Sequence, residues 1–324
     1  MSRGSGYALT GPPSARAVVY LYTQTGQLRE VTEALTAPLH EHNWDVRSVD
    51  VQPRHAFPFP WPIQRFFGVF ARATDPKGLV ELVEPEEGFG SAEDELVILA
   101  YQVWYLAPSL PMRSLLVNHP ESVRGRDVIA VIACRNMWYS AAIEARGLLR
   151  AAGARSVEVV ATTDTRSSFT TLVTTLRWLL TGKREPFLWF GRAGVGDDEL
   201  MRVADVGEHL AEFRPRPTGM APVVPGLAVA DILAGRIFRL WGAVVRRAAQ
   251  RGKAAHAASL IAFVWTLKTG LLIGLPLAAL AQLVGGPRFA ARVRLFVDAR
   301  ISFGRPAYSE PSTSAVGPSA SVSS

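Results

Sequence analysis

The sequence predicts an α/β fold in which helices cover both faces of a parallel five-stranded sheet. Two observations support this prediction. Several segments of strand length are continuous apolar runs, which are typical of parallel strands buried on both faces. Patterns of helical periodicity lie between these runs, and strands that alternate with helices indicate right-handed crossover connections. The predicted class is therefore a doubly wound sheet.

The expected strands are RAVVYLY (16–22), ELVILAY (95–101), DVIAVIAC (127–134), SVEVVAT (156–162) and a weaker candidate, WDVRSVDV (44–51). A helix is predicted after the first strand, because apolar residues recur on one of its faces at Leu28, Val31, Leu35 and Leu39. Five strands in this succession fit the flavodoxin-like strand order 2-1-3-4-5. A hydrophobic helical appendage is expected at the C-terminus.

The chain divides by composition into five parts. These are a flexible leader (1–14), a flavodoxin-like domain (15–185) with an aromatic insertion (52–92), an amphipathic helical extension (186–250), a hydrophobic, basic-flanked segment (251–305) and a disordered tail (306–324). The leader lacks the apolar region of a secretory signal. The tail is rich in Ser, Pro and Ala, which is typical of disorder.

The turn after the first strand predicts an anion site. It contains Thr23, Gln24, Thr25, Gly26 and Gln27. Free N–H groups and the dipole at the helix start attract an anion, and glycine lets the backbone approach it closely. No lysine follows, so the turn is not a nucleotide P-loop. We expect a monophosphate held by neutral donors; the alternative is an ordinary turn with a threonine N-cap.

Aromatic and polar side chains follow two other strands. Trp104 and Tyr105 follow the strand at 95–101, and CRNMWY (134–139) ends the strand at 127–134. Stacking surfaces, donors and one positive charge suit a planar redox ring attached to a phosphate, so FMN is the predicted cofactor. Trp138 is expected to contact this ring. The alternative is that Trp104 and Trp138 only cover the sheet.

The same strand ends offer candidate catalytic groups. Arg135 suits stabilisation of an enolate or of the reduced flavin, although it could instead pair with Asp164. Asn136 could orient a carbonyl, and Tyr139 could exchange a proton, as could two other tyrosines, Tyr101 and Tyr105. Cys134 is expected to be a small buried hydrophobe rather than a nucleophile.

Several motifs resemble one known family. The segments YTQTGQL, FPFPW, LAYQVWYLAPSLP, CRNMWYSA and LRWLLTGKRE are similar to the dialkylresorcinol condensing enzyme family, over about residues 16–200. The resemblance implies a flavodoxin fold of the FMN reductase type and a ketosynthase partner. It also implies oxidation of a 2,5-dialkyl-cyclohexane-1,3-dione to an aromatic dialkylresorcinol. By resemblance, residues 23–27 bind the FMN phosphate and Trp104 and Tyr105 flank the ring; no catalytic residue is implied.

The aromatic insertion suits a lipid-like substrate. Phe57, Phe59, Trp61 and Phe66, stiffened by neighbouring prolines, are expected to line a channel for alkyl chains. Alternatively, these side chains cover the sheet edge or form the interface of a homodimer.

The C-terminal third predicts contact with a membrane. The stretch 257–284 is long enough to span a bilayer, but Lys268 lies near its middle and Pro276 interrupts it. A tilted span, a re-entrant hairpin and an in-plane anchor are all compatible with this pattern, as is a soluble hairpin packed on the domain. Arginines on both sides and a net charge of +7 favour anionic lipid over nucleic acid. We expect a cytoplasmic protein, peripheral to or anchored at the inner face of the membrane.

Three functions are compatible with the sequence. The first is the FMN-dependent aromatisation that the resemblance implies. The second is a membrane-associated NAD(P)H:quinone or FMN reductase, with NAD(P)H as reductant. The third is a flavin-free partner or scaffold for the ketosynthase. The six histidines are scattered and Cys134 is the single cysteine, so the sequence predicts no metal site.

Overall fold

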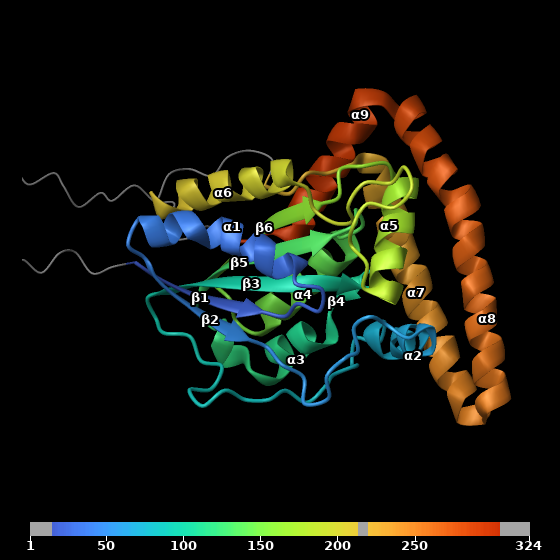
Figure 1. The fold of residues 1–324 in the computed structure, drawn as a ribbon, viewed down its shortest axis with the longest axis horizontal. Coiled ribbons are helices and arrows are strands. Elements are labelled where there is room, and N and C mark those ends of the chain that lie inside the picture. Colours follow the sequence, from blue (N-terminus) through green and yellow to red (C-terminus); the bar gives the residue numbers. More distant parts are fainter. Residues whose placement is uncertain (1–14, 213–219, 305–324) are drawn as a thin grey trace, which may run out of the picture.

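The computed structural model describes residues 15–212 and 220–304, so the leader (1–14) and the tail (306–324) lie outside the described residues. Its strands are β1 (Arg16–Leu21), β2 (Asp45–Asp50), β3 (Glu95–Trp104), β4 (Ala107–Pro108), β5 (Asp127–Cys134) and β6 (Ser156–Thr163). The parallel strands have the order β2-β1-β3-β5-β6, which confirms the predicted flavodoxin-like arrangement (Figure 1).

The described sheet has six strands rather than the five predicted. The additional strand, β4, is two residues long and pairs antiparallel with the end of β3. It forms because the chain reverses at Tyr105 and Leu106, both of which have positive φ angles. This reversal carries no sequence signal, because such turns usually contain Gly, Asn or Asp.

Helices cover both faces of the sheet (Figure 1). Their bounds are α1 (Gln27–Glu41), α2 (Ile63–Ala73), α3 (Leu110–Asn118), α4 (Tyr139–Ala151), α5 (Ser168–Thr181) and α6 (Asp197–Ala211). Helices α1 and α6 pack side by side on one face, and α3 and α4 pack on the other. The covering layer therefore extends to residue 211, beyond the boundary expected at residue 185.

The C-terminal helical appendage is confirmed. It consists of α7 (Pro225–Arg251), α8 (Lys253–Thr269), a π-helical turn η2 (Gly270–Gly274) and α9 (Leu275–Ile301), which breaks at Gly286 before Pro287. Helix α7 packs against α2 and α4, and α8 packs against α7. In Figure 1, α8 stands at the outer edge of the molecule and α9 returns towards the sheet.

A buried carboxylate joins α7 to the start of α4. Asp231 is fully buried and accepts hydrogen bonds from the backbone N–H groups of Tyr139 (3.1 Å) and Ser140 (2.9 Å). These N–H groups have no partner within their own helix. Burial raises the pKa of Asp231 to about 6, although the hydrogen bonds from Ser140 and Tyr139 act in the opposite direction.

We expect Asp231 to make the stability of the protein depend on pH. Its pKa is higher in the folded than in the unfolded state, so its contribution to stability is largest at low pH and decreases as pH rises from about 4 to about 6. Asp231→Asn removes this titration. The difference in unfolding free energy between wild type and variant should therefore fall by about 3 kcal/mol over this range. Urea denaturation of both proteins at several pH values measures the unfolding free energies. A difference between them that does not change with pH would contradict the prediction.

Candidate functional site

The turn between β1 and α1 has an open backbone surface. Gly26 is the N-cap of α1 and is left-handed, with φ 83°. A Cβ atom at Gly26 would meet no atom within 4 Å. Its N–H donates to Thr23 Oγ1 (3.1 Å), and no side-chain cap bond satisfies the start of α1. The structure therefore does not show the alternative of a threonine N-cap, and it leaves the helix start facing open space.

The aromatic insertion closes over this turn. Gln24 Nε2 donates to the carbonyl oxygen of Pro58 (2.8 Å), and Gln24 Oε1 accepts from Trp61 Nε1 (3.0 Å). The backbone N–H of Trp61 donates to Leu179 of α5 (2.7 Å), and its side chain is only 5% exposed. Trp61 is thus held between the turn and α5, and the side chain of Gln24 contacts the insertion. The role of Gln24 at the phosphate stays a prediction.

Trp104 lies within an aromatic cluster. Its ring centroid is 4.8 Å from that of Phe57, 5.8 Å from that of Trp61 and 5.7 Å from that of Tyr22. Phe59 is half-buried in the same loop. The structure thus brings the predicted cofactor residue Trp104 together with two of the predicted channel residues, over the turn at residues 23–27.

Tyr105 faces another part of the insertion. Its hydroxyl donates to the carbonyl oxygen of Phe66 (2.6 Å), and its ring lies 5.4 Å from that of Phe66 and 5.0 Å from that of Phe70. The backbone is strained at this point, with φ 50° at Tyr105 and 63° at Leu106. Strain of this kind costs on the order of 1–3 kcal/mol for each residue and concentrates at functional sites.

Trp138 and Tyr139 are in the protein core. Their rings stack with centroids 4.3 Å apart, and both side chains are buried. The Tyr139 hydroxyl accepts from the N–H of Val224 (3.0 Å), and burial raises the pKa of this hydroxyl to about 12. The roles of Trp138 at the cofactor and of Tyr139 in proton exchange stay predictions, which this burial does not favour.

Arg135 carries a half-buried positive charge at the end of β5. Burial lowers its pKa, while Cys134 and Asp164 act in the opposite direction. The backbone N–H of Asp164 donates to the carbonyl oxygen of Arg135 (3.0 Å), but the Asp164 carboxylate accepts from Arg166 Nε (2.7 Å). Asp164 is therefore paired with Arg166. Asn136 is buried beside Arg135.

Cys134 does not have the properties of a nucleophile. Burial raises the pKa of its thiol to about 12. The thiolate, which is the reactive form, is therefore strongly disfavoured at neutral pH. Cys134 is only partly buried and packs against the hydrophobic core.

Unpaired polar atoms are buried around the same edge of the sheet. Among the described residues, they include Gln27 Nε2 at the start of α1, the Tyr101 hydroxyl and Gln102 Oε1 near the end of β3, and Trp138 Nε1. A buried polar atom without a partner costs about 1–3 kcal/mol. Because Tyr101 and Trp138 are fully buried in the core, only Gln27 and Gln102 of these residues remain candidates for contact with a ligand. Gln102 is not among the site residues predicted from the sequence, where its only signal is its position at the end of the strand predicted at 95–101.

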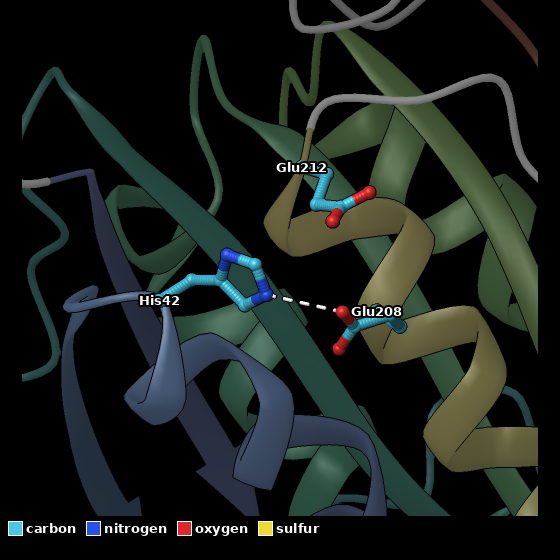
Figure 2. A group of neighbouring side chains, drawn as sticks. All are labelled: His42, Glu208 and Glu212. Carbon is cyan, nitrogen blue, oxygen red and sulfur yellow. Dashed lines mark hydrogen bonds and ion pairs between the residues drawn. The ribbon is translucent and has the colours of Figure 1, made fainter.

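A second polar group lies at the other end of α1. His42 Nε2 is 3.1 Å from Glu208 Oε1 of α6, and Glu212, the C-cap residue of α6, lies nearby (Figure 2). The side-chain nitrogen and carboxylate oxygens that could ligate a metal ion lie within 4.8 Å of one another. The sequence could not reveal this group, because His42 and Glu208 are 166 positions apart. The His42–Glu208 contact joins α1 to α6, and we assign it a structural role.

Comparisons with known proteins do not identify a family. No family model and no curated protein matches the chain. A flavodoxin from the domain Archaea is similar in part, with 16% identity, a TM-score of 0.32 and coverage of 61% of this chain and 96% of that one. A protein from Bacteroides eggerthii DSM 20697, described as a flavoprotein, has 15% identity and a TM-score of 0.35, with coverage of 51% of this chain and 98% of that one. The fold assignment rests on strand order, not on these likenesses.

Proposed function

We propose that this chain is an FMN-dependent oxidoreductase acting on an apolar cyclic substrate. The observation that carries the proposal is the closure of the aromatic insertion over the turn at residues 23–27, through the contact of Gln24 with Trp61 (3.0 Å). Doubly wound sheets bind ligands at this position, beyond the carboxyl ends of the strands where strand order reverses. An aromatic cover there suits a planar ring and apolar substituents.

The residues of the turn fit a phosphate group. Gly26 leaves open space at the start of α1, Thr23 and Thr25 offer hydroxyls, and the helix dipole favours an anion. The ring would lie towards Trp104 and Tyr105, with Arg135 supplying positive charge. Bound FMN would supply the capacity to accept a hydride. The chain's own residues hold the phosphate, exclude water and stabilise negative charge.

The finer proposal is aromatisation of a 2,5-dialkyl-cyclohexane-1,3-dione. Conversion to a resorcinol removes two hydrogens from the ring; bound oxidised flavin would supply the hydride acceptor, and a proton would be released to solvent. Arg135 stabilises the enolate oxygen formed from the acidic dione, and Asn136 orients the second carbonyl. Phe57, Trp61 and Phe66 accommodate the alkyl chains. The resemblance of the motifs supports a ketosynthase as the partner that supplies this substrate.

A visible absorption spectrum tests cofactor binding. The full chain is purified in mild detergent, mixed with FMN and freed of excess cofactor. We expect one perturbed flavin per chain. A colourless protein would overturn the proposal and favour a flavin-free scaffold.

The reaction is tested by mixing the flavin-loaded protein anaerobically with one equivalent of either the dione or NAD(P)H. A 2,5-dialkyl-cyclohexane-1,3-dione should bleach the flavin absorption and yield one resorcinol per flavin. Bleaching by NAD(P)H but not by the dione would overturn the aromatisation and favour the alternative of a quinone reductase. The exposed apolar side chains of α8 and α9 would suit the membrane quinone that this alternative requires.

Replacing Arg135 should slow ring oxidation far more than it weakens FMN binding. In Arg135→Gln the enolate loses its cation, and we expect single-turnover oxidation to fall about 100-fold, with less than about a threefold change in FMN affinity. Arg135→Lys, which keeps the charge, should recover part of the rate. The control is Arg166→Gln, because Arg166 is paired with Asp164. Unchanged turnover in Arg135→Gln would remove Arg135 from the mechanism.

We also propose that the protein works at the cytoplasmic face of a membrane. Within the described residues, one helical stretch, Lys253–Gly274, is long and apolar enough to cross a bilayer by length and composition, with mean hydropathy 1.6. Length and composition do not distinguish a span from a helix lying on the surface, so the contacts of this stretch must decide.

A further inference from the structure

Helix α8, η2 and the first part of α9 form a continuous helical arm (residues 253–285) with an exposed apolar surface. Large apolar side chains that are more than half exposed along it are Ile261, Trp265, Leu272, Ile273, Leu277, Leu280, Leu283 and Val284. Leu283 is 80% exposed and Leu272 is 76% exposed. Soluble proteins rarely expose apolar side chains over such a length without a partner.

The C-terminal segment that contains this arm is strongly basic. Residues 220–304 contain eleven Lys and Arg but only two acidic residues, Asp231 and Asp298. This region therefore carries a formal charge of +9, more than the +7 of the whole chain, and Asp231 is buried. Within the arm, Lys268 lies 4.9 Å from the ring of the exposed Trp265. Tryptophan and lysine beside exposed leucines are typical of helices at an anionic membrane interface.

Both ends of the arm are attached to the same globular domain. Near its start, Phe263 stacks on Phe70 of α2, with ring centroids 3.9 Å apart. Near its end, Gln282 Oε1 accepts from the N–H of Gly226 (2.9 Å). Beyond the break at Gly286, α9 returns to the sheet, where Phe303 pairs with Val157 of β6.

These attachments exclude a spanning helix in this fold. A span must place its ends on opposite sides of a hydrocarbon layer about 30 Å thick. The arm could do so only by giving up the stacking of Phe263 on Phe70 or the contacts that follow Gly286. A helix lying in the plane of the interface keeps all of these contacts and leaves its exposed side facing the lipid.

We propose that the arm docks in the plane of an anionic phospholipid bilayer, with its exposed apolar side chains among the lipid chains and the surrounding Lys and Arg residues on the headgroups. The proposal is independent of flavin binding. The arm is nevertheless packed close to the candidate site, because the buried ring of Phe70 contacts both Phe263 of the arm (3.9 Å) and Tyr105 (5.0 Å).

Vesicle sedimentation with the full chain tests the docking. Vesicles of phosphatidylcholine alone are compared with vesicles that also contain phosphatidylglycerol. We expect binding to the anionic vesicles, weakened by salt because the attraction is screened, and released by alkaline carbonate washing. Equal binding to neutral vesicles together with resistance to carbonate would indicate a span and overturn the proposal.

A double variant, Leu272→Glu with Leu283→Glu, should reduce vesicle binding at least about tenfold, because it places two charges on the inserted surface. The matched control is Met201→Glu with Val117→Glu, which alters two exposed apolar residues of α6 and α3 and should bind like wild type. Circular dichroism and FMN content check folding of both variants. Equal binding by the two double variants would contradict the proposed surface.

Trp265 reports the orientation of the docked arm. Its fluorescence should be quenched by brominated lipids in anionic vesicles, and Trp265→Phe should remove the lipid-dependent part of the quenching. Absence of vesicle binding, combined with a dimer in solution that Leu272→Glu dissociates, would assign the apolar surface to a second copy of the chain and overturn membrane docking.

Discussion

The variant Thr25→Val with Gly26→Val is expected to lose FMN. Thr25 would no longer offer a hydroxyl to the phosphate, and a hydrogen bond to a charged group is worth about 1.5–3 kcal/mol. At Gly26 the new side chain would occupy the open space at the start of α1, where the phosphate is proposed to lie. We therefore expect FMN affinity to fall at least about 100-fold, measured by titration of the flavin absorption.

Gly125→Val is the matched control for backbone strain. Gly26 and Gly125 have similar positive φ angles, 83° and 73°, and a Cβ at either meets no atom within 4 Å. Gly125 precedes β5, at the amino edge of the sheet. Both variants should lose comparable stability, on the order of 1–3 kcal/mol, but Gly125→Val should keep its flavin. Undiminished FMN in the Thr25→Val and Gly26→Val variant would refute a phosphate site in this turn.

Replacing Arg113 by methionine is expected to destabilise the protein by about 3–5 kcal/mol. The guanidinium is completely buried and donates to the carbonyl oxygens of Ala73 (2.7 Å) and Asp75 (2.9 Å), at the end of α2 in the middle of the aromatic insertion. It also forms an ion pair with Glu144 of α4 (2.7 Å). Methionine would leave these acceptors buried and the Glu144 charge poorly compensated. Urea denaturation measures the loss.

Arg72→Met is the matched control, because Arg72 is exposed and belongs to the same part of the insertion. Its substitution should change stability by less than about 1 kcal/mol. Adding Glu144→Leu to Arg113→Met should recover part of the loss, because it removes the uncompensated carboxylate. A loss below about 1 kcal/mol in Arg113→Met would contradict the proposed role of this residue in holding the insertion.

The sheet could be predicted because its signals are local. Apolar runs of strand length, separated by helical periodicity, identify buried parallel strands without knowledge of any long-range contact. The weaker segment at 44–51 became β2 through pairing with β1. The strand β4 was missed because it depends on positive φ angles at Tyr105 and Leu106, which residues of these types rarely adopt.

The segments of the candidate site could be predicted from the sequence, but the way their side chains pack together could not. The turn at residues 23–27 and the ends of β3 and β5 were visible as polar and aromatic residues after apolar runs. The sequence does not show which of these residues face a ligand. Trp138 and Tyr139 lie in the core because α7, about 90 positions later, packs over the start of α4 through Asp231.

By itself, the sequence determined the buried parallel strands, the polar turn after the first of them and a basic, apolar C-terminal region, since each follows from side chains close together in the chain. Only the tertiary structure decided that Trp61 closes over the turn by bonding to Gln24, and that both ends of the helical arm attach to one domain. These contacts join residues 37 to 193 positions apart, and packing and hydrogen-bond geometry, not local pattern, select such partners.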